Sequence, residues 1–341
     1  MKAVVLEKIG DSNEAFSVKE VDEPSALEED EVLIEVEAFG LNFADVMARR
    51  GLYNDAPPLP SILGYDVVGK VRKSGAQKGD FLIGKRVVAM TRFGGYAQWA
   101  KTKISGVAVI GEKMQAFEAS ALATQYCTAY YACCEAANLF ESEKILLHAA
   151  AGGVGTAITQ LAKLKGCMVY GLTSSKKKVS YLENNGVDFP IVSKDGQYHE
   201  QLTKLLNGRK LDAVFNSVGG KTFKKDLKLL DKGGRFLLYG VADRLSMRKG
   251  FLGTLELLWK FGLITPIQLL INSQMVAGIN MLRIADYKPK TLNRCLEKVV
   301  EMTLSNDLSP KKGGIFSVDD ISEAHSLLES RSSVGKIIVN W

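Results

Sequence analysis

The chain has 341 residues, which is long for one domain and sufficient for two. Hydrophobic residues make up 46% of it and charged residues 24%, as in a globular protein with substantial cores. The net charge of +6 is dispersed along the sequence. This argues against the clustered basic face that nucleic-acid binding needs, so no nucleic-acid partner is expected.

The cysteines indicate a reducing compartment. The chain has five, an odd number, and no two of them form a CxxC pair. We therefore expect free intracellular thiols rather than a disulfide framework. The N-terminal stretch MKAVVLEKIG carries charge and lacks the apolar core of a signal peptide, so a cytoplasmic location is expected.

Residues 1 to about 110 are predicted to form β structure. Short segments rich in Val and Ile, separated by turn signals, read AVVLE, VLIEVEAFG, VVGKVRKSG and KRVVAM. An Ala-rich helical pattern follows from about Gln115. From Lys144 onward strands alternate with helices, which predicts a parallel sheet and an α/β fold class.

A glycine cluster lies at the first strand-to-helix turn of this alternating region. In HAAAGGVG, residues 148–155, Ala150 stands where the first glycine of a GxGxxG motif is expected. Gly152 then allows close approach of a pyrophosphate, and Gly155 allows close packing of helix on strand. The strand before the cluster and the helix after it supply the context of a dinucleotide site, with Gly153 and Val154 at the helix N-terminus. The alternative is a tight turn that binds no ligand.

The residues after the next strand bear on the choice of cofactor. NAD-selective folds carry an acidic residue about twenty positions beyond the glycines. Here that position is Ser174, followed by Ser175 and the lysines up to Lys178, and no acid occurs before Glu183. Hydroxyl groups and positive charge suit a 2′-phosphate, so NADPH is expected in preference to NADH. The alternative is a solvated lysine run on a helix.

The longest apolar stretch, residues 251–271, is interrupted by Glu256, Lys260 and Pro266. The interruptions argue against a membrane span. A buried helix pair, a substrate wall or a dimer surface is the preferred interpretation, with peripheral membrane contact as the alternative. The tail then returns to helix and strand patterns, and we expect it to rejoin the N-terminal domain. The predicted domains are 1–122 with 299–341, and 123–298.

Several motifs resemble the medium-chain dehydrogenase/reductase superfamily, and within it the zinc-free NADPH:quinone oxidoreductases. AFGLNFADVMARRGLY (38–53) resembles that branch's AxGLNxxD…RxGxY signature, and LPSILGYDVVGKV (59–71) its P-x-x-x-G-x-(E/D)-x-x-G-x-V stretch. HAAAGGVG, DAVFNSVGG and GGRFLLYG are similar to its glycine motif and later strand ends. The apolar insert resembles the vesicle amine transport protein-like group of this branch. The resemblance implies a GroES-like β domain, built from both termini, with a Rossmann doubly wound parallel-sheet domain.

The resemblance also allows the zinc ligands to be checked. Zinc-dependent members use a Cys near the position of Asn42, a His where Tyr65 stands, and a Cys near Gln125. Residues 88–115, where a structural zinc lobe would lie, contain no cysteine. One nearby cysteine cannot make a three- or four-ligand site, so no zinc is expected. Among the histidines, His148 is predicted to be structural, and His199 and His325 to be exposed.

The resemblance implies roles for particular residues. Asn42 is implied beside the nicotinamide or its ribose, where it can hydrogen-bond a substrate oxygen; the alternative is an amide that fixes a loop. Tyr53 and Tyr65 are implied to line the substrate cleft, with Tyr53 as a stacking residue or proton donor or, alternatively, in ordinary packing. The remaining residues implied in cofactor binding are Thr128, Ser217, Val218, Gly240 and Val241.

The expected activity is hydride transfer from NADPH to a quinone or another α,β-unsaturated carbonyl, since no metal is available to polarise a less reactive substrate. An enoyl-thioester reductase is the first alternative, and a cofactor-binding interaction protein without turnover is the second. A homodimer is expected, with the strand in MVAGINML pairing across a two-fold axis.

Overall fold

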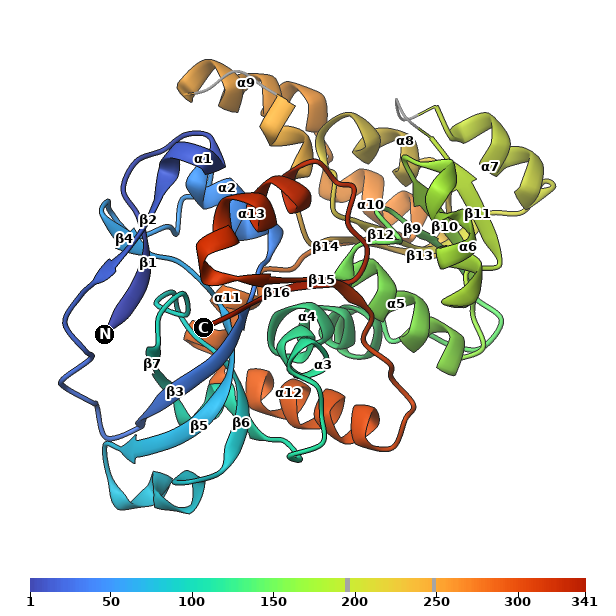
Figure 1. The fold of residues 1–341 in the computed structure, drawn as a ribbon. Coiled ribbons are helices and arrows are strands. Elements are labelled where there is room, and N and C mark those ends of the chain that lie inside the picture. Colours follow the sequence, from blue (N-terminus) through green and yellow to red (C-terminus); the bar gives the residue numbers. More distant parts are fainter. Residues whose placement is uncertain (194–196, 247–249) are drawn as a thin grey trace. The chain divides into compact units, whose positions relative to one another are not determined.

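A computed structural model describes residues 1–193, 197–246 and 250–341, without the side chains of residues 246 and 250–252. The chain forms two compact units, Met1–Cys127 with Met281–Trp341, and Thr128–Asn280 (Figure 1). Residues 281–298 group with the first unit, whereas the sequence assigned them to the second. The physical reason is that α12 packs against β8 and the turn before it, both in the first unit.

The first unit is built on a seven-stranded sheet. Six strands follow the order β15-β16-β3-β5-β6-β8, and the seventh, β7, pairs with the N-terminal half of β3. A smaller sheet has the order β2-β1-β4. The strands are β1 Lys2–Leu6, β2 Phe16–Glu20, β3 Glu31–Gly40, β4 Ser61–Ile62, β5 Asp66–Ser74, β6 Arg86–Met90, β7 Trp99–Lys103, β8 Val107–Val109, β15 Lys312–Ser317 and β16 Lys336–Asn340. The helices are α1 Ser12–Ala15, α2 Phe43–Arg49, α3 Ala116–Ala121, α11 Met281–Tyr287, α12 Pro289–Leu304 and α13 Ile321–Glu329.

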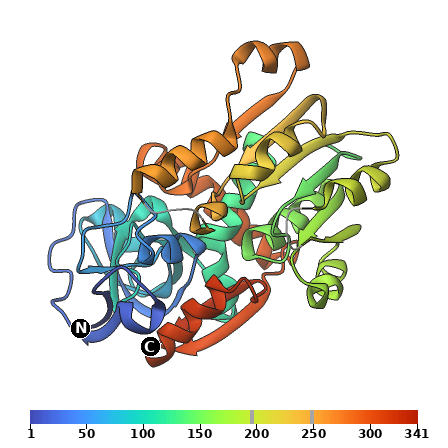
Figure 2. The ribbon, with the colours of Figure 1, turned by 90° about the horizontal axis from the view of Figure 1, so that it is seen from above.

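The two ends of the chain meet in this unit. Strand β16 pairs antiparallel with β3, with Ile338 opposite Gly40, and the C-terminal helix α13 packs on α1 and α2 (Figure 2). The apolar side chains of these strands form one buried core, which includes Ile34, Phe39 and Val339. The expectation that the tail rejoins the N-terminal residues is therefore met.

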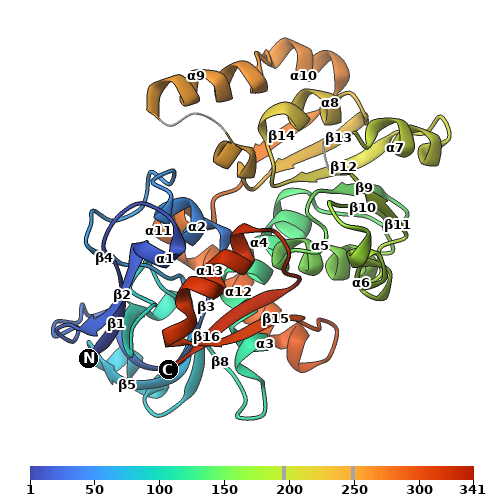
Figure 3. The ribbon, with the colours of Figure 1, turned by 45° about the horizontal axis from the view of Figure 1, so that its top comes forward.

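The second unit is built on a six-stranded sheet with the order β11-β10-β9-β12-β13-β14, all parallel (Figure 3). Numbered from β9, this is the 3-2-1-4-5-6 order of a dinucleotide-binding doubly wound fold, whose direction reverses between β9 and β12. The strands are β9 Lys144–Leu147, β10 Met168–Thr173, β11 Phe189–Val192, β12 Leu211–Asn216, β13 Leu230–Leu238 and β14 Met275–Gly278. The helices are α4 Cys127–Tyr130, α5 Gly153–Leu164, α6 Val179–Asn184, α7 His199–Leu206, α8 Phe223–Leu227, α9 Gly250–Phe261 and α10 Pro266–Asn272.

These two architectures confirm the predicted α/β class, a GroES-like β unit and a Rossmann unit. The helical stretch 116–136, where the division between the units falls, contains two π-helical segments, Leu122–Tyr126 and Tyr131–Ala136. Such segments are uncommon and often occur near functional residues.

Helices α9 and α10 correct one expectation. In the described part of this stretch the apolar side chains are not buried within the chain: Trp259 is 81% exposed, Leu263 92% and Leu270 80%. By length and composition alone, residues 253–272 qualify as a candidate membrane span among the described residues, with none of the apolar window buried. The buried helix pair is therefore wrong for the single chain, because these helices carry more apolar surface than the adjacent sheet covers.

His325 is also placed differently from the expectation, since it is fully buried rather than exposed. Helix α13 turns Ile321, Ala324 and His325 to the interior, where the His325 Nε2 lies 3.2 Å from the Tyr96 hydroxyl and the ring packs on Phe16. Burial, with a smaller effect of Arg49, lowers the pKa of His325 to about 3. The imidazole is therefore neutral in the folded chain.

We predict that His325 makes the fold acid-sensitive. The unfolded chain takes up a proton at this residue below about pH 6.5 while the folded chain does not, so stability falls by roughly 1.4 kcal/mol per pH unit from there toward pH 3. His325→Phe removes this contribution. Urea unfolding from pH 7 to 4.5 should show wild type losing stability faster than the variant, and parallel pH profiles would contradict the prediction.

Candidate functional site

The glycine turn lies at the carboxyl end of β9, where the sheet order reverses. Gly152 is the N-cap of α5, and the first bond within the helix runs from the Thr156 N–H to the Gly152 carbonyl at 2.8 Å. The N–H groups of Gly153, Val154 and Gly155 precede that bond and so have no carbonyl of the helix to bind. Together with the helix dipole, they form a site suited to an anion.

Two backbone features shape this turn. A Cβ on Gly155 would lie 2.7 Å from the Ala150 Cα and 2.8 Å from its carbonyl oxygen, so only glycine allows α5 to approach the turn this closely. Ala149 adopts a φ of 50°, in the left-handed region that disfavours a side chain. The turn therefore stores local strain in order to hold the helix end at the edge of the sheet.

The other predicted cofactor residues of this unit follow neighbouring strands. Ser174, Ser175 and Lys178 come after β10, Ser217 and Val218 after β12, and Gly240 and Val241 after β13. Because the strands are parallel, their carboxyl ends meet at one edge, and this edge also carries the glycine turn. A Cβ on Gly240 would come within 2.8 Å of the Ser217 carbonyl, which shows how closely the last two segments approach.

The segment after β10 combines hydroxyl groups with positive charge. The Ser175 hydroxyl accepts from the Lys177 N–H at 3.3 Å and caps the turn Lys176–Lys178. Ser174 is exposed, and Lys178 is half-buried, with its pKa lowered by desolvation. A partly buried ammonium group has lost some of its hydration. Its binding to an anionic partner is therefore more favourable in free energy than that of a fully solvated lysine.

Thr128 also belongs to this unit, where it is buried on α4. Its position differs from that of the strand-end residues, because it comes from a helix that precedes the first strand. The structure thus brings the predicted residues of strands β9, β10, β12 and β13 to one edge, while Thr128 comes from a separate element.

In the first unit, Asn42 is buried as the N-cap of α2. Its backbone N–H donates to Asp45 Oδ2 at 2.8 Å. Its side-chain Nδ2 donates to Asp66 Oδ2 at 2.6 Å, and its Oδ1 accepts from Lys336 Nζ at 3.2 Å. Asp45 therefore fixes the loop and the start of the helix, while Asp66 and Lys336 hold the amide.

Tyr53 and Tyr65 lie together, with ring centroids 6.5 Å apart in an edge-on arrangement. Tyr65 is buried, next to the Tyr53 side chain. Burial and the neighbouring Asp45 raise its pKa far above the ordinary value, and burial raises that of Tyr53 as well. Both phenols are thus neutral and able to donate a hydrogen bond.

Lys336, Asp66 and Thr124 were not predicted as site residues: Lys336 and Asp66 bond the Asn42 amide, and Thr124 bonds Asp66. Lys336 and Asp66 are fully buried and ion-paired, and the Thr124 hydroxyl donates to the other oxygen of Asp66. The signal in the sequence was weak but present: Lys336 is a single charge at the start of the apolar strand KIIV. Charged residues are rarely buried without a partner, but the partner here is 270 residues away.

No three His, Cys, Asp or Glu side chains of the described ranges come close enough to hold a metal ion. The resemblance implies zinc ligands near Asn42, at Tyr65 and near Gln125. An amide and a phenol are poor substitutes for thiolate and imidazole at a tetrahedral zinc site.

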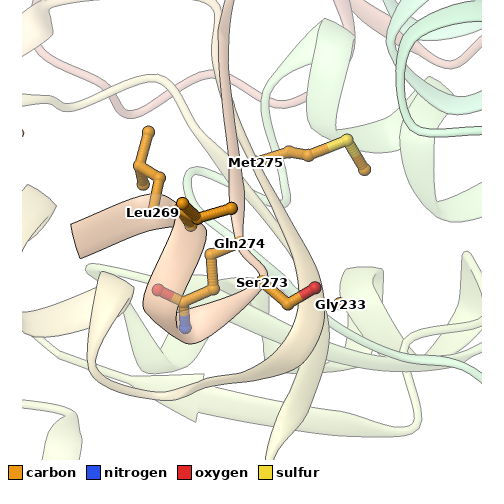
Figure 4. Close-up of a pocket in the computed structure, with 6 residues that line it drawn as sticks. Gly233, Leu269, Ser273, Gln274 and Met275 are labelled. Carbon is orange, nitrogen blue, oxygen red and sulfur yellow. The ribbon is translucent and has the colours of Figure 1, made fainter. Parts of the chain in front are cut away.

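A cavity of about 340 Å³ lies elsewhere on the second unit. Figure 4 shows it between the end of α10 and the amino ends of β13 and β14, lined by Leu269, Leu270, Ser273, Gln274, Met275 and Gly233. Since the glycine turn follows the carboxyl end of β9, this cavity lies at the opposite edge of the sheet and is separate from the dinucleotide-type turn.

Two family descriptions match the chain: "Alcohol dehydrogenase GroES-like domain" over residues 28–143 and "Zinc-binding dehydrogenase" over residues 153–290. The human synaptic vesicle membrane protein VAT-1 homolog is 30% identical over 312 residues, which are 91% of this chain and 78% of that protein. A highly-reducing polyketide synthase of Aureobasidium melanogenum is 31% identical over 323 residues, but the chain spans only 14% of its length.

Solved structures are also similar to this chain over its whole length. The human VAT-1 homolog-like protein superposes with a TM-score of 0.85 at 25% identity, covering 100% of this chain and 98% of that one. Escherichia coli quinone oxidoreductase, complexed with NADPH, gives 0.84 at 25% identity with both chains fully covered. A mycobacterial protein complexed with NADPH gives 0.85 at 25% identity, again over both full chains.

A GroES-like unit together with a Rossmann unit that carries a glycine turn defines an oxidoreductase fold, and the chain belongs to the medium-chain dehydrogenase/reductase superfamily. Within the superfamily it fits the branch that contains the VAT-1 homologues and the quinone oxidoreductases. The predicted resemblance is thereby confirmed.

We predict that Asp45 destabilises the fold at neutral pH. Burial raises its pKa to about 7, against 3.8 as the ordinary value, although the Asn42 N–H opposes the shift. The unfolded chain therefore releases this proton first, and stability falls as pH rises from about 4 to 7, by roughly 1.4 kcal/mol per unit. Asp45→Asn keeps an acceptor for Asn42 but cannot ionise.

Urea unfolding should therefore favour Asp45→Asn over wild type more strongly at pH 8 than at pH 5. Asp80→Asn, which removes an exposed carboxylate from the same unit, is the matched control. A difference between Asp45→Asn and wild type that stays constant across this range would contradict the prediction.

Proposed function

We propose that this protein is a zinc-independent oxidoreductase that transfers hydride from NADPH to a quinone or another α,β-unsaturated carbonyl compound. The observation that carries the proposal is the edge of the six-stranded sheet. There the three N–H groups at the start of α5 adjoin the segments that follow β10, β12 and β13.

The residues at this edge fit the parts of a dinucleotide phosphate. Gly153, Val154 and Gly155 would bind the pyrophosphate through backbone N–H groups, and Gly152 would allow its close approach, since the Gly152 N–H itself donates to the Ala149 carbonyl at 2.9 Å. Ser174, Ser175 and Lys178 would bind the 2′-phosphate. The ribose and nicotinamide would be held by Thr128, Ser217, Val218, Gly240 and Val241. When bound, NADPH supplies the hydride, and the protein supplies binding and orientation.

The first unit supplies polar groups that suit a substrate carbonyl. The Asn42 amide has one N–H left after its bond to Asp66, and it can donate to an oxygen that gains negative charge. The Tyr65 hydroxyl is a neutral donor, and Tyr53 lies edge-on to it. We assign Asn42 to carbonyl polarisation, Tyr65 to substrate binding, and Tyr53 to stacking or proton donation.

The proposal includes no zinc, because the resemblance puts Asn42, Tyr65 and Gln125, whose side chains are poor zinc ligands, at or near the ligand positions. Substrates that accept hydride at a conjugated carbon need less polarisation than an isolated ketone, so donors such as Asn42 suffice. Incubation with zinc should leave the turnover unchanged.

An enoyl-thioester reductase is the second candidate. It is favoured by the similarity of the chain to one segment of a polyketide synthase. A protein that binds cofactor without turnover is the third, since the VAT-1 homologues are described as vesicle membrane proteins. All three candidates share the cofactor site and differ in what accepts the hydride.

The deciding experiment measures NADPH oxidation by the full chain with a quinone, an enone and an enoyl-thioester. Turnover with the quinone or the enone supports the proposal. Faster turnover with the thioester favours the second candidate, and tight NADPH binding with no oxidation of any acceptor favours the third.

We predict that Lys178→Ala reduces the preference for NADPH over NADH by about tenfold, because one cation near a 2′-phosphate contributes on the order of 1–2 kcal/mol. Fluorescence titration with each cofactor measures the two dissociation constants. Lys177→Ala removes an exposed neighbouring charge and is the matched control. An unchanged NADPH:NADH ratio in Lys178→Ala would refute the assigned phosphate pocket.

The proposal also includes a homodimer formed at β14, the edge strand of the sheet, where Met275 and Val276 are exposed. We predict that light scattering gives a dimer for wild type and a monomer for Val276→Asp. Val109→Asp, on the exposed edge strand β8 of the other sheet, should stay dimeric. A monomeric wild type would overturn this part of the proposal.

The cytoplasm is the proposed location.

A further inference from the structure

We propose that Lys336 is a positioning residue that, together with Asp66, fixes the orientation of the Asn42 amide for reduction of the substrate. The inference rests on the function proposed above and adds a requirement to it. Lys336 makes no assigned contact with substrate or cofactor and acts through Asn42.

The three groups form a closed set of contacts from three elements. Lys336 begins β16, Asp66 begins β5, and Asn42 precedes α2. The Lys336 ammonium bonds to Asp66 Oδ2 and, at 3.2 Å, to Asn42 Oδ1, while Asn42 Nδ2 donates to the same Asp66 oxygen at 2.6 Å. All three side chains are buried, and Lys336 and Asp66 are fully so.

These contacts determine which way the amide faces. An ammonium group can only donate and a carboxylate can only accept, so Oδ1 must face Lys336 and Nδ2 must face Asp66. The remaining N–H of Nδ2 then has a fixed direction. A cation on Oδ1 also draws electron density from the amide and makes that N–H a stronger donor.

The Lys336 side chain passes through the space where a side chain at Gly40 would otherwise lie. On β3, a Cβ at Gly40 would lie 2.8 Å from the Lys336 Nζ and would overlap its Cε. The pairing of β16 with β3 places Ile338 opposite Gly40, so the lysine stem passes the position where a side chain is absent. The approach therefore depends on both the strand register and the glycine.

The alternative to a positioning role is that the Lys336–Asp66 ion pair only holds β16 against β5 and has no effect on Asn42. Buried ion pairs are costly to desolvate and contribute little net stability compared with apolar residues of similar volume. Stability loss alone therefore cannot separate the two roles, and the test needs a readout that depends on Asn42.

The test measures kcat, KM and the NADPH dissociation constant of the full chain for Lys336→Met. It includes the pair Asp66→Asn with Lys336→Met, which removes both charges and keeps an oxygen facing Asn42. We expect kcat to fall about tenfold in both variants, with NADPH affinity within about twofold of wild type, as for the loss of one charge-assisted hydrogen bond.

Arg86→Met is the matched control. Arg86 is a buried cation of the same sheet, paired with Glu37 and bonded to the Met114 carbonyl, and it makes no contact with Asn42. We expect it to lower the melting temperature but to leave kcat within about twofold, since only the structural contribution is lost.

The decisive comparison uses Asn42→Ala as background. If Lys336 acts through Asn42, Lys336→Met lowers kcat in wild type but not in Asn42→Ala, while its effect on melting temperature is the same in both. An equal fall of kcat in both backgrounds, or wild-type kcat in the charge-free pair, overturns the inference. An active wild type whose Asn42→Ala variant is fully active refutes the proposed role of Asn42, and a wild type inactive with every acceptor refutes the proposed function.

Discussion

The constraint on which the rest of the second unit depends is the set of unpaired backbone N–H groups at the start of α5. The start of any helix leaves these groups without carbonyl partners inside the helix, and Gly155 lets the helix sit close to the turn at Ala149 and Ala150. The proposed cofactor residues that follow β10, β12 and β13 lie at this same edge, because parallel strands end there together.

The first unit solves a different physical problem, which is to keep several polar groups in a dry interior. Asn42, Asp45, Asp66 and Lys336 are all buried, and hydrogen bonds join them. A buried polar group without a hydrogen-bond partner costs more free energy than one hydrogen bond contributes. Each of these side chains is therefore held in the orientation that satisfies its neighbours. This connectivity is what gives one amide a defined direction.

Local patterns in the sequence predicted much of this. The glycine turn at the start of α5 follows from a motif within a few residues, and the return of the tail to the N-terminal residues was expected from its change of pattern and is seen in the pairing of β16 with β3. The roles of the residues at the strand ends stay predictions. The surroundings of Asn42 could not be predicted, since Lys336 lies 294 residues away in the chain and no local pattern encodes the pairing. For helices α9 and α10 the apolar pattern in the sequence was clear. Such a pattern does not tell whether residues of the same chain cover those side chains. His325 was misjudged because a polar side chain was expected at the surface, although it shares one helix face with the buried Ile321 and Ala324.

The central claim is that the glycine edge binds a phosphorylated dinucleotide, and isothermal titration of the wild-type chain tests it most directly. We expect one NADPH to bind per chain, more tightly than NADH. Absence of binding heat with both cofactors, or tighter binding of NADH, would contradict it.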